Sequence, residues 1–272
     1  MQFDIITIFP DFFSSVLSHG VLRRAIATER VGVRIHDLRA FTHDRHRTVD
    51  DRPFGGGEGM VLRPEPLAEA LESLGITAQP RRAADAVPSA QQVILLSAQG
   101  RRFDQAAARE LASLDRLFLI CGRYEGVDER VNELFCDREL SIGDYVLSGG
   151  ELAAAVVVDA VARLLPGVLG NDASSAFESF GLADPGPQAG DGPPSSTHGS
   201  GGLLDYPHYT RPPQFRGLAV PPVLAQGDHA AIRRWRRERA LEKTWRNRPD
   251  LLASADLSDE DRAFLRNLGW HG

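Results

Sequence analysis

The sequence predicts an α/β fold with a largely parallel sheet, followed by a small C-terminal all-α domain. Period-two runs rich in β-branched residues alternate with helical patterns through the first 165 residues, as in α/β layer folds. Glycine gathers in three connections, at 97–100, 122–126 and 142–150, each between a predicted strand and the next helix. These connections should lie at the carboxyl end of the sheet, where such folds bind ligands.

The elements follow one another in regular order along the chain. Strands are expected near 2–8, 31–36, 92–97, 116–121 and 138–142, and helices at 11–27, 66–74, 103–114, 127–135 and 150–165. Asp11 is the expected N-cap of the first helix, and the third helix should begin near Asp104, because side-chain oxygens there accept from unpaired N–H groups. Two further helices are expected at 228–247 and 258–268.

Composition divides the chain into three parts, expected at 1–170, 171–202 and 203–272. The stretch 181–202 holds 14 Gly, Pro or Ser in 22 residues. Such a segment buries too little apolar surface to offset the entropy of ordering it. We therefore expect the middle part to be a flexible linker between an α/β domain and a helical domain.

The charge balance argues against a protein coated in basic surface. The 272 residues include 37 acidic and 31 basic side chains, a net charge of −6. Residues 228–248 reverse this balance, with eight Lys or Arg against three acids. On a helix their apolar face would hold Ile232, Trp235, Leu241 and Trp245, and their basic face Arg233, Arg236, Arg237 and Lys243. The basic face would suit RNA phosphates; a solvated face paired with Glu238 and Glu242 is the alternative.

Several classes of protein are excluded. The longest apolar run, 152–158, is far shorter than the roughly 18 residues that cross a membrane. The first residues predict a strand and not a secretion signal. Cys121 and Cys136 are the only thiols, which favours a reducing, cytoplasmic setting without disulfides or a zinc knuckle. The acidic and histidine residues show no metal-ligand spacing.

The glycine motifs do not complete any common nucleotide-binding or hydrolase signature. LSGGE (147–151) is like an ATPase signature loop, but the chain lacks GxxxxGK[ST]. FGGGEGM (54–60) does not complete GxGxxG, and HExxH and GxSxG are absent. Two interpretations remain for the three glycine connections: a small-ligand site beside an RNA site, or tight turns and helix caps.

Long motifs in the chain resemble one family, the bacterial tRNA (guanine-N1)-methyltransferases of the SPOUT superfamily. The motifs are THDRHRTVDDRPFGGGEGM (42–60), ILLSAQGRRFDQ (94–105), LICGRYEGVDERV (119–131), SIGDYVLSGGE (141–151), DAVARLLPGVLG (159–170), LLDYPHYTRP (203–212), VPPVL (220–224) and HAAIRRWRRERALEKTW (229–245). They occur in order over nearly the whole chain.

The resemblance implies a SPOUT-type sheet with a deep trefoil knot that binds S-adenosylmethionine. It implies methylation of guanine N1 at position 37 of tRNA, by a homodimer with a shared active site and with help from magnesium, the C-terminal domain holding the tRNA. The implied cofactor residues are Leu96, Ser97, Gly100, Gly122, Tyr124, Glu125, Ile142, Gly143, Tyr145, Leu147, Gly149 and Gly150. The implied substrate residues are Asp50, Arg52, Gly57, Gly59, Arg233, Arg236 and Arg237.

The resemblance also implies two catalytic residues, because N1 of guanine must lose a proton before it can attack. Arg163 would stabilise the charge that develops towards O6. Glu178 stands where the family has an aspartate as general base, so its carboxylate reaches further by about one bond, roughly 1.5 Å. Glu178 as an ordinary loop acid and Arg163 as a helix-end arginine are the alternatives.

Three departures from the family pattern leave other functions open. Besides Glu178, Ala98 and Glu58 stand where proline is usual. The alternatives are a knotted methyltransferase that acts on another RNA base, and a catalytically silent RNA-binding homologue.

Overall fold

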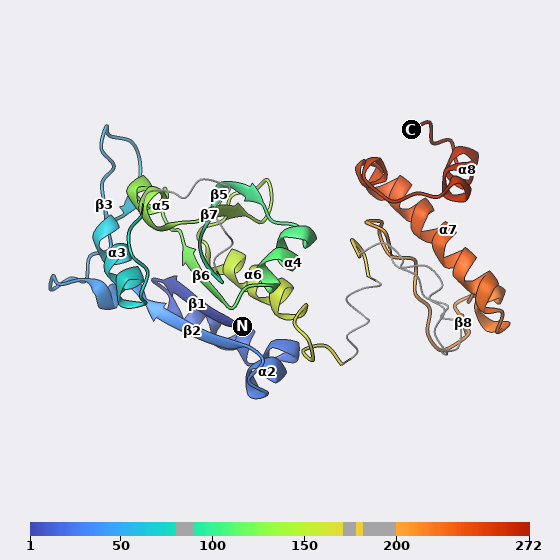
Figure 1. Ribbon diagram of the computed structural model, residues 1–272, viewed down its shortest axis with the longest axis horizontal. Helices are drawn as coiled ribbons and strands as arrows, with labels where there is room; N and C mark the ends of the chain where they lie inside the picture. Colours follow the sequence, from blue (N-terminus) through green and yellow to red (C-terminus); the bar gives the residue numbers. More distant parts are fainter. Residues whose placement is uncertain (80–89, 171–177, 182–199) are drawn as a thin grey trace. The chain divides into compact units, whose positions relative to one another are not determined.

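The chain divides into two compact units, Met1–Gly170 and Asn171–Gly272 (Figure 1). The computed structural model describes residues 1–79, 90–170, 178–181 and 200–272. Most of the linker expected at 171–202 lies outside these residues. Each unit is described by itself.

A five-stranded sheet with strand order β2-β1-β6-β5-β7 forms the centre of the first unit. The strands are β1 (Gln2–Thr7), β2 (Gly32–Asp37), β5 (Gln91–Arg102), β6 (Arg116–Cys121) and β7 (Arg138–Ser141). Every adjacent pair runs parallel. The predicted parallel sheet and its five strands are confirmed.

Helices cover both faces of this sheet. They are α1 (Phe13–Leu17), α2 (Gly20–Ala27), α3 (Pro64–Ser73), α4 (Gln105–Ala112), α5 (Glu129–Phe135) and α6 (Glu151–Ala162), with 3-10 turns η1 (Pro10–Phe12) and η2 (Leu38–Phe41). Helices α2, α4 and α6 pack on one face, and α3 and α5 on the other. Asp104 and Asp128 cap α4 and α5 with side-chain oxygens, so the predicted start of the helix near Asp104 is confirmed.

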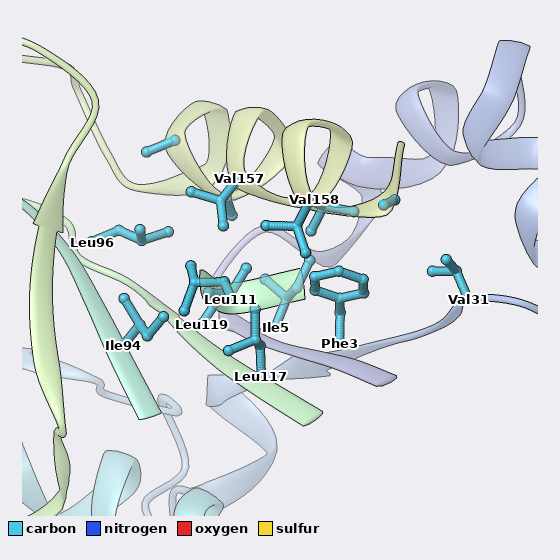
Figure 2. Close-up of a cluster of buried hydrophobic side chains, with 14 of the residues drawn as sticks. Phe3, Ile5, Val31, Ile94, Leu96, Leu111, Leu117, Leu119, Val157 and Val158 are labelled. Carbon is cyan, nitrogen blue, oxygen red and sulfur yellow. The ribbon is translucent and has the colours of Figure 1, made fainter. Parts of the chain in front are cut away.

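Alternating strand residues supply the two cores. In β1, Phe3 and Ile5 point to the face that α6 covers, and Ile6 points to the opposite face. Figure 2 shows Phe3 and Ile5 below Val157 and Val158 of α6. Each fully buried side chain of this size contributes about 1.5–3 kcal/mol. Burial on both faces explains why the central strands read as almost continuous apolar runs.

The single helix expected at 11–27, with Asp11 as its cap, is wrong. The structure has η1, α1 and α2 there, and the helix is interrupted at Ser18 and His19, which lie between α1 and α2. Pro10 occupies the first position of η1, where its fixed φ and missing N–H are tolerated, so Asp11 lies inside the turn.

The loop expected at 97–100 is instead an interruption within β5. Strand β5 continues to Arg102, and both Leu96 and Arg101 pair with Leu140 of β7. The residues between them therefore bulge out of the ladder. A Cβ on Gly100 would lie 2.6 Å from the carbonyl carbon of Leu140, so only glycine lets the two backbones approach this closely.

The second unit contains two main helices, α7 (His229–Asn247) and α8 (Asp259–Asn267), with short turns η4 (Pro222–Ala225) and η5 (Pro249–Ala253). Asp228 caps α7, and Ser258 with Asp261 forms a capping box on α8. The core includes Leu203, Leu241 and Leu265. The expectation of an all-α domain is wrong in one respect, because β8 (Gln214–Phe215) and β9 (Leu218–Ala219) form an antiparallel pair.

Across the described part of the chain, a search for helices with the length and hydropathy of a membrane span finds none.

Candidate functional site

A cavity of about 340 Å³ lies between the interruption of β5 and the segments that follow β6 and β7. Its walls come from three segments, 95–99, 122–129 and 139–150 with Ala153 beside them. The three glycine connections therefore meet at one place, as predicted, although the first of them lies within β5 and only the other two follow a strand end.

Eleven of the twelve expected cofactor residues line this cavity. They are Leu96, Ser97, Gly122, Tyr124, Glu125, Ile142, Gly143, Tyr145, Leu147, Gly149 and Gly150. Gly100 is not among the lining residues, because its backbone is packed against β7.

Hydrogen bonds join the second and third glycine connections. The Gly150 N–H donates to the Gly122 carbonyl at 2.8 Å, and Arg123 forms an antiparallel bridge with Gly149. In the third connection, the Tyr145 N–H donates to the Gly143 carbonyl at 2.9 Å. These bonds set the shape of the cavity wall through main-chain groups.

The cavity also has lining residues that the sequence did not single out, including Arg123, Ser141 and Ser148. The Ser141 hydroxyl donates to the Gly143 carbonyl at 3.0 Å, and the Gly143 N–H lies 3.3 Å from the same hydroxyl. Their position within or beside the glycine connections, with Ser141 as the last residue of β7, was an available signal. Their side-chain directions were not.

The thiol of Cys121 lies at the end of β6, below this cavity. Burial raises the pKa of Cys121 well above its ordinary value, and the nearby carboxylate of Glu151 adds to the effect. The residue therefore remains a thiol and is unsuited to act as a nucleophile.

The loop at 52–60, called the triglycine loop because it contains Gly55, Gly56 and Gly57, lies beside the second glycine connection at 122–126. It runs between the short antiparallel strands β3 (Asp50–Asp51) and β4 (Val61–Leu62). The Glu125 N–H donates to the Met60 carbonyl at 3.0 Å, and a Cβ on Gly59 would lie 2.6 Å from Cγ of Glu125. Because Glu125 lines the cavity, the loop that carries the expected substrate residues Arg52, Gly57 and Gly59 borders the cavity, and Asp50 lies in the adjoining strand β3. Phe54 at its tip is 100% exposed.

The two expected catalytic residues belong to different units. Arg163 is the C-cap of α6 in the first unit, and its N–H donates to the Asp159 carbonyl at 3.2 Å. Glu178 belongs to the second unit, as the first of the described residues 178–181.

Hydrogen bonds attach the segment that carries Glu178 to the motif at 203–212. The Phe180 N–H donates to the Leu203 carbonyl at 2.8 Å, and the Asp205 N–H donates to the Ser179 hydroxyl at 2.9 Å. Asp205 also lies 2.9 Å from Nε2 of His208. The candidate base is therefore adjacent to a fixed network.

The expectation of a basic stripe that faces outward from α7 is wrong for Arg237. Its guanidinium forms a fork with Asp261, at 3.1 and 2.7 Å, and also donates to the Asp256 carbonyl at 2.9 Å. Only 20% of its side chain is exposed. Burial would raise the pKa of Asp261, but the hydrogen bonds from Arg237 and the Ser258 N–H outweigh it and lower that pKa.

The other basic residues of α7 differ in their surroundings. Arg236 lies over the ring of Tyr206, 4.8 Å from its centroid, and Lys243 is exposed. Glu242 pairs with Arg239 and Arg246 along the helix, so part of the positive charge is neutralised within α7.

Among the residues that the structure describes, no three His, Cys, Asp or Glu side chains come together as a metal site.

Comparisons with known proteins agree with these features. A family profile described as tRNA (Guanine-1)-methyltransferase TrmD matches residues 1–254. A tRNA (guanine-N(1)-)-methyltransferase of Koribacter versatilis is 60% identical over 268 residues, 98% of each chain. A protein of the same name from Geobacter sulfurreducens is 49% identical over 272 residues, 100% of this chain and 99% of the relative. The chain belongs to the family of tRNA (guanine-N1)-methyltransferases.

Proposed function

We propose that this chain transfers a methyl group from S-adenosylmethionine to N1 of the guanine at position 37 of tRNA, next to the anticodon. The observation that supports this most strongly is the cavity of about 340 Å³, around which eleven expected cofactor residues lie. Its volume is in the range of small-molecule sites. Membership of the family supports methyl transfer to guanine N1 in tRNA.

A trefoil knot at this cavity is part of the proposal. Two close approaches of chain segments support it: the backbone of Gly100 against Leu140, and the hydrogen bond between Gly150 and Gly122. Such crossings bring backbone N–H and C=O groups from three connections to one ligand. Main-chain groups of this kind suit an adenosine ring and ribose.

When bound, S-adenosylmethionine supplies an electrophilic methyl group on a positively charged sulfur. The chain's own task is to make N1 of guanine nucleophilic. We assign the Glu178 carboxylate to accept the N1 proton, which frees the nitrogen lone pair to form the new bond to the methyl carbon. We assign the Arg163 guanidinium to stabilise the negative charge that develops towards O6. No step is assigned to magnesium.

We further propose a homodimer whose active sites are shared between subunits. The first unit exposes several large apolar side chains near the cavity and along α6, namely Phe9, Phe12, Tyr145, Val146, Leu152 and Val156. Leu152 and Val156 are four residues apart on α6, so they share one face of the helix. Exposed large apolar side chains on one helix face favour an interface, which a second copy would cover.

The dimer is tested by Leu152→Glu combined with Val156→Glu. Buried charge at an interface should convert the protein to monomers in analytical ultracentrifugation and abolish methyl transfer. Leu134→Glu is the matched control, since Leu134 is an exposed leucine on α5, on the opposite face of the sheet. A double variant that remains dimeric would refute this interface.

The RNA contacts proposed for this enzyme combine loop and helix residues. Arg52 and Phe54 are exposed on the loop at the cavity's border, where a guanidinium suits a phosphate and an aromatic ring suits a base. Arg233 and Lys243 would provide phosphate contacts from α7. A cytoplasmic setting, where tRNA is modified, belongs to the same proposal.

The deciding experiment is a methyl-transfer assay on tRNA transcripts with guanine or another base at position 37. We expect transfer only to guanine, and a loss of about 10²–10⁴-fold in kcat for Glu178→Gln, because the variant cannot accept the proton. Glu178→Asp should keep more activity than Glu178→Gln. Glu260→Gln, which changes an exposed acid on α8, should behave as the wild type.

Two outcomes would favour other functions. Transfer to transcripts without guanine at position 37 would indicate an enzyme that acts on another base. Binding of S-adenosylmethionine and tRNA without any transfer would indicate a silent RNA-binding homologue.

A further inference from the structure

A buried carboxylate, that of Glu151, directly follows the cavity-lining residue Gly150 and has no part in the proposed chemistry. Glu151 is the first residue of α6, and only 4% of it is exposed. Its Oε1 accepts a hydrogen bond of 2.8 Å from the Thr7 hydroxyl, at the end of β1. That hydroxyl in turn accepts from the Phe9 N–H at 3.0 Å. One oxygen of the carboxylate is therefore fixed by a neighbouring strand.

The second oxygen of Glu151 faces Arg123. Oε2 lies 3.9 Å from Nε of Arg123, within ion-pair range but beyond a hydrogen bond. The guanidinium of Arg123 also lies over the ring of Phe9, 4.5 Å from its centroid, and donates to the Ser148 carbonyl. Arg123 thus connects the buried carboxylate to the third glycine connection.

The packing at Gly149 indicates that this pair supports the cavity wall. A Cβ at this position would lie 2.5 Å from Oε2 of Glu151 and 2.7 Å from Cδ of Arg123. The third glycine connection therefore packs directly against the side chains of Glu151 and Arg123. Arg123, Ser148 and Gly149 all line the cavity.

A buried ion pair is by itself weak support for stability, because removing two charges from water costs about as much as their attraction returns. Its position is more informative than its energy. The pair lies where two cofactor loops must keep a fixed separation, and it contacts both of them.

We propose that Glu151 is a positioning residue that acts through Arg123 to hold Ser148 and Gly149 at the cavity wall, and so sets the affinity for S-adenosylmethionine. This inference rests on the proposed function and identifies a residue that tunes the same site. Glu151 itself does not touch the methyl donor or the guanine. Its effect should fall on donor binding, with little effect on tRNA.

The first test is calorimetric titration of S-adenosylmethionine into the full-length wild type and into Glu151→Gln. Because Arg123 would lose its charged partner and hold Ser148 less firmly, we expect the Kd of the variant to rise by about 10- to 100-fold, the scale of one lost interaction with a charged group. The KM for S-adenosylmethionine should rise with it. The KM for tRNA should stay within about twofold, since Glu151 lies below the donor site.

Asp4→Asn is the matched control. Asp4 is also a fully buried carboxylate in an ion pair, with Arg116 and His36, but none of the three residues lines the cavity. This variant should have a lower Tm and an unchanged Kd for S-adenosylmethionine. A purely structural role of Glu151 predicts the same behaviour for both variants.

The route through Arg123 is tested by a double-mutant cycle. If Glu151 acts by orienting Arg123, then Glu151→Gln should add little to the Kd of an Arg123→Gln variant. Thr7→Val, which keeps the side-chain shape and removes the hydroxyl, should weaken donor binding in the same direction. Additive effects in the cycle would overturn the route.

The outcomes separate this inference from the proposed function. A wild type that does not bind S-adenosylmethionine would refute the proposed function itself. A wild type that binds it, with Glu151→Gln binding equally well, would overturn the positioning role. If Glu151→Gln does not fold, Thr7→Val decides, and an unchanged Kd in that variant overturns the role.

Discussion

Asp4 lies in the middle of β1 with its side chain fully buried. One carboxylate oxygen is 2.7 Å from Nε2 of His36 and the other accepts from Nε of Arg116, also at 2.7 Å. Burial alone would raise the pKa of Asp4, but these hydrogen bonds outweigh it and hold the pKa below its ordinary value. The ionised carboxylate of Asp4 therefore stabilises the sheet, in which β1 lies between β2 and β6.

A lowered pKa in the folded state makes stability depend on pH in a defined direction. The contribution of Asp4 is fully present above the unfolded pKa of about 3.9 and is lost as the pH falls through the lower folded value. Asp4→Asn should lose about 3 kcal/mol of unfolding free energy at pH 7, with a much smaller loss in the acid range. Urea unfolding at several pH values measures this.

The exposed acid Asp11 provides the control for that measurement. Asp11→Asn should change the unfolding free energy by less than about 0.5 kcal/mol, both at pH 7 and in the acid range. An Asp4→Asn variant with the same pH dependence as the wild type would show that the buried pair does not control acid stability.

At the scale of elements, strand β5 shows how one glycine fixes the pairing of two strands. The register of β5 on β7 shifts between Leu96 and Arg101, and Gly100 occupies the closest approach to Leu140. The bulge places Ser97 and Gln99 in the cavity wall. Strand register and cavity shape therefore depend on the same residue.

Gly100→Ala should separate β5 from β7 and enlarge the cavity mouth. A methyl group 2.6 Å from a carbonyl carbon cannot be accommodated without backbone movement, so we expect a loss of about 2–4 kcal/mol in stability and weaker binding of S-adenosylmethionine. Thermal unfolding and calorimetry measure the two effects. Gly170→Ala is the matched control, since its Cβ would meet nothing closer than 4.0 Å. Wild-type stability in Gly100→Ala would contradict the role of this contact.

Helix α7 carries both structural and exposed basic residues. Arg237→Ala would remove both hydrogen bonds that the guanidinium donates to the buried carboxylate of Asp261. The second unit should therefore lose about 3 kcal/mol of unfolding free energy. Lys243→Ala is the control, because Lys243 is exposed and its loss should leave the Tm unchanged while reducing the salt dependence of tRNA binding. Equal Tm values for both variants would contradict this division of roles.

At the scale of the whole molecule, the net charge of −6 limits nonspecific binding to RNA. Positive charge is concentrated locally in α7, where residues 228–248 hold eight Lys or Arg against three acids. The two expected catalytic residues are divided between the two units of the chain. A shared active site would bring Arg163 of one subunit to Glu178 of the other.

Mixed dimers of two inactive variants test this arrangement. If the site is shared, a heterodimer of Arg163→Ala and Glu178→Gln subunits contains one site with both residues intact, and should recover about half of the wild-type activity. Co-expression with two different tags allows the heterodimer to be purified and assayed. A heterodimer as inactive as its two parents would show that each site is formed within one subunit.

The sequence alone determined the parallel sheet, because periodicity and β-branched residues reflect local backbone preference and burial on both faces. It also located the start of α4 near Asp104 and the ends of β6 and β7, after which two of the glycine connections begin. The resemblance of long motifs added the residues that line the cavity, which lie far apart in the chain and meet only after folding.

Only the tertiary structure decided how these segments pack. Three contacts join residues that are distant in sequence or that lie on different elements. They are the shifted pairing of β5 with β7, the ion pair of Arg237 with Asp261, and the ion pair of Arg123 with Glu151. Helical periodicity placed Arg237 on the basic face, but it could not show that Asp261 of α8 would meet it there. Such contacts depend on close packing in three dimensions, which local pattern does not encode.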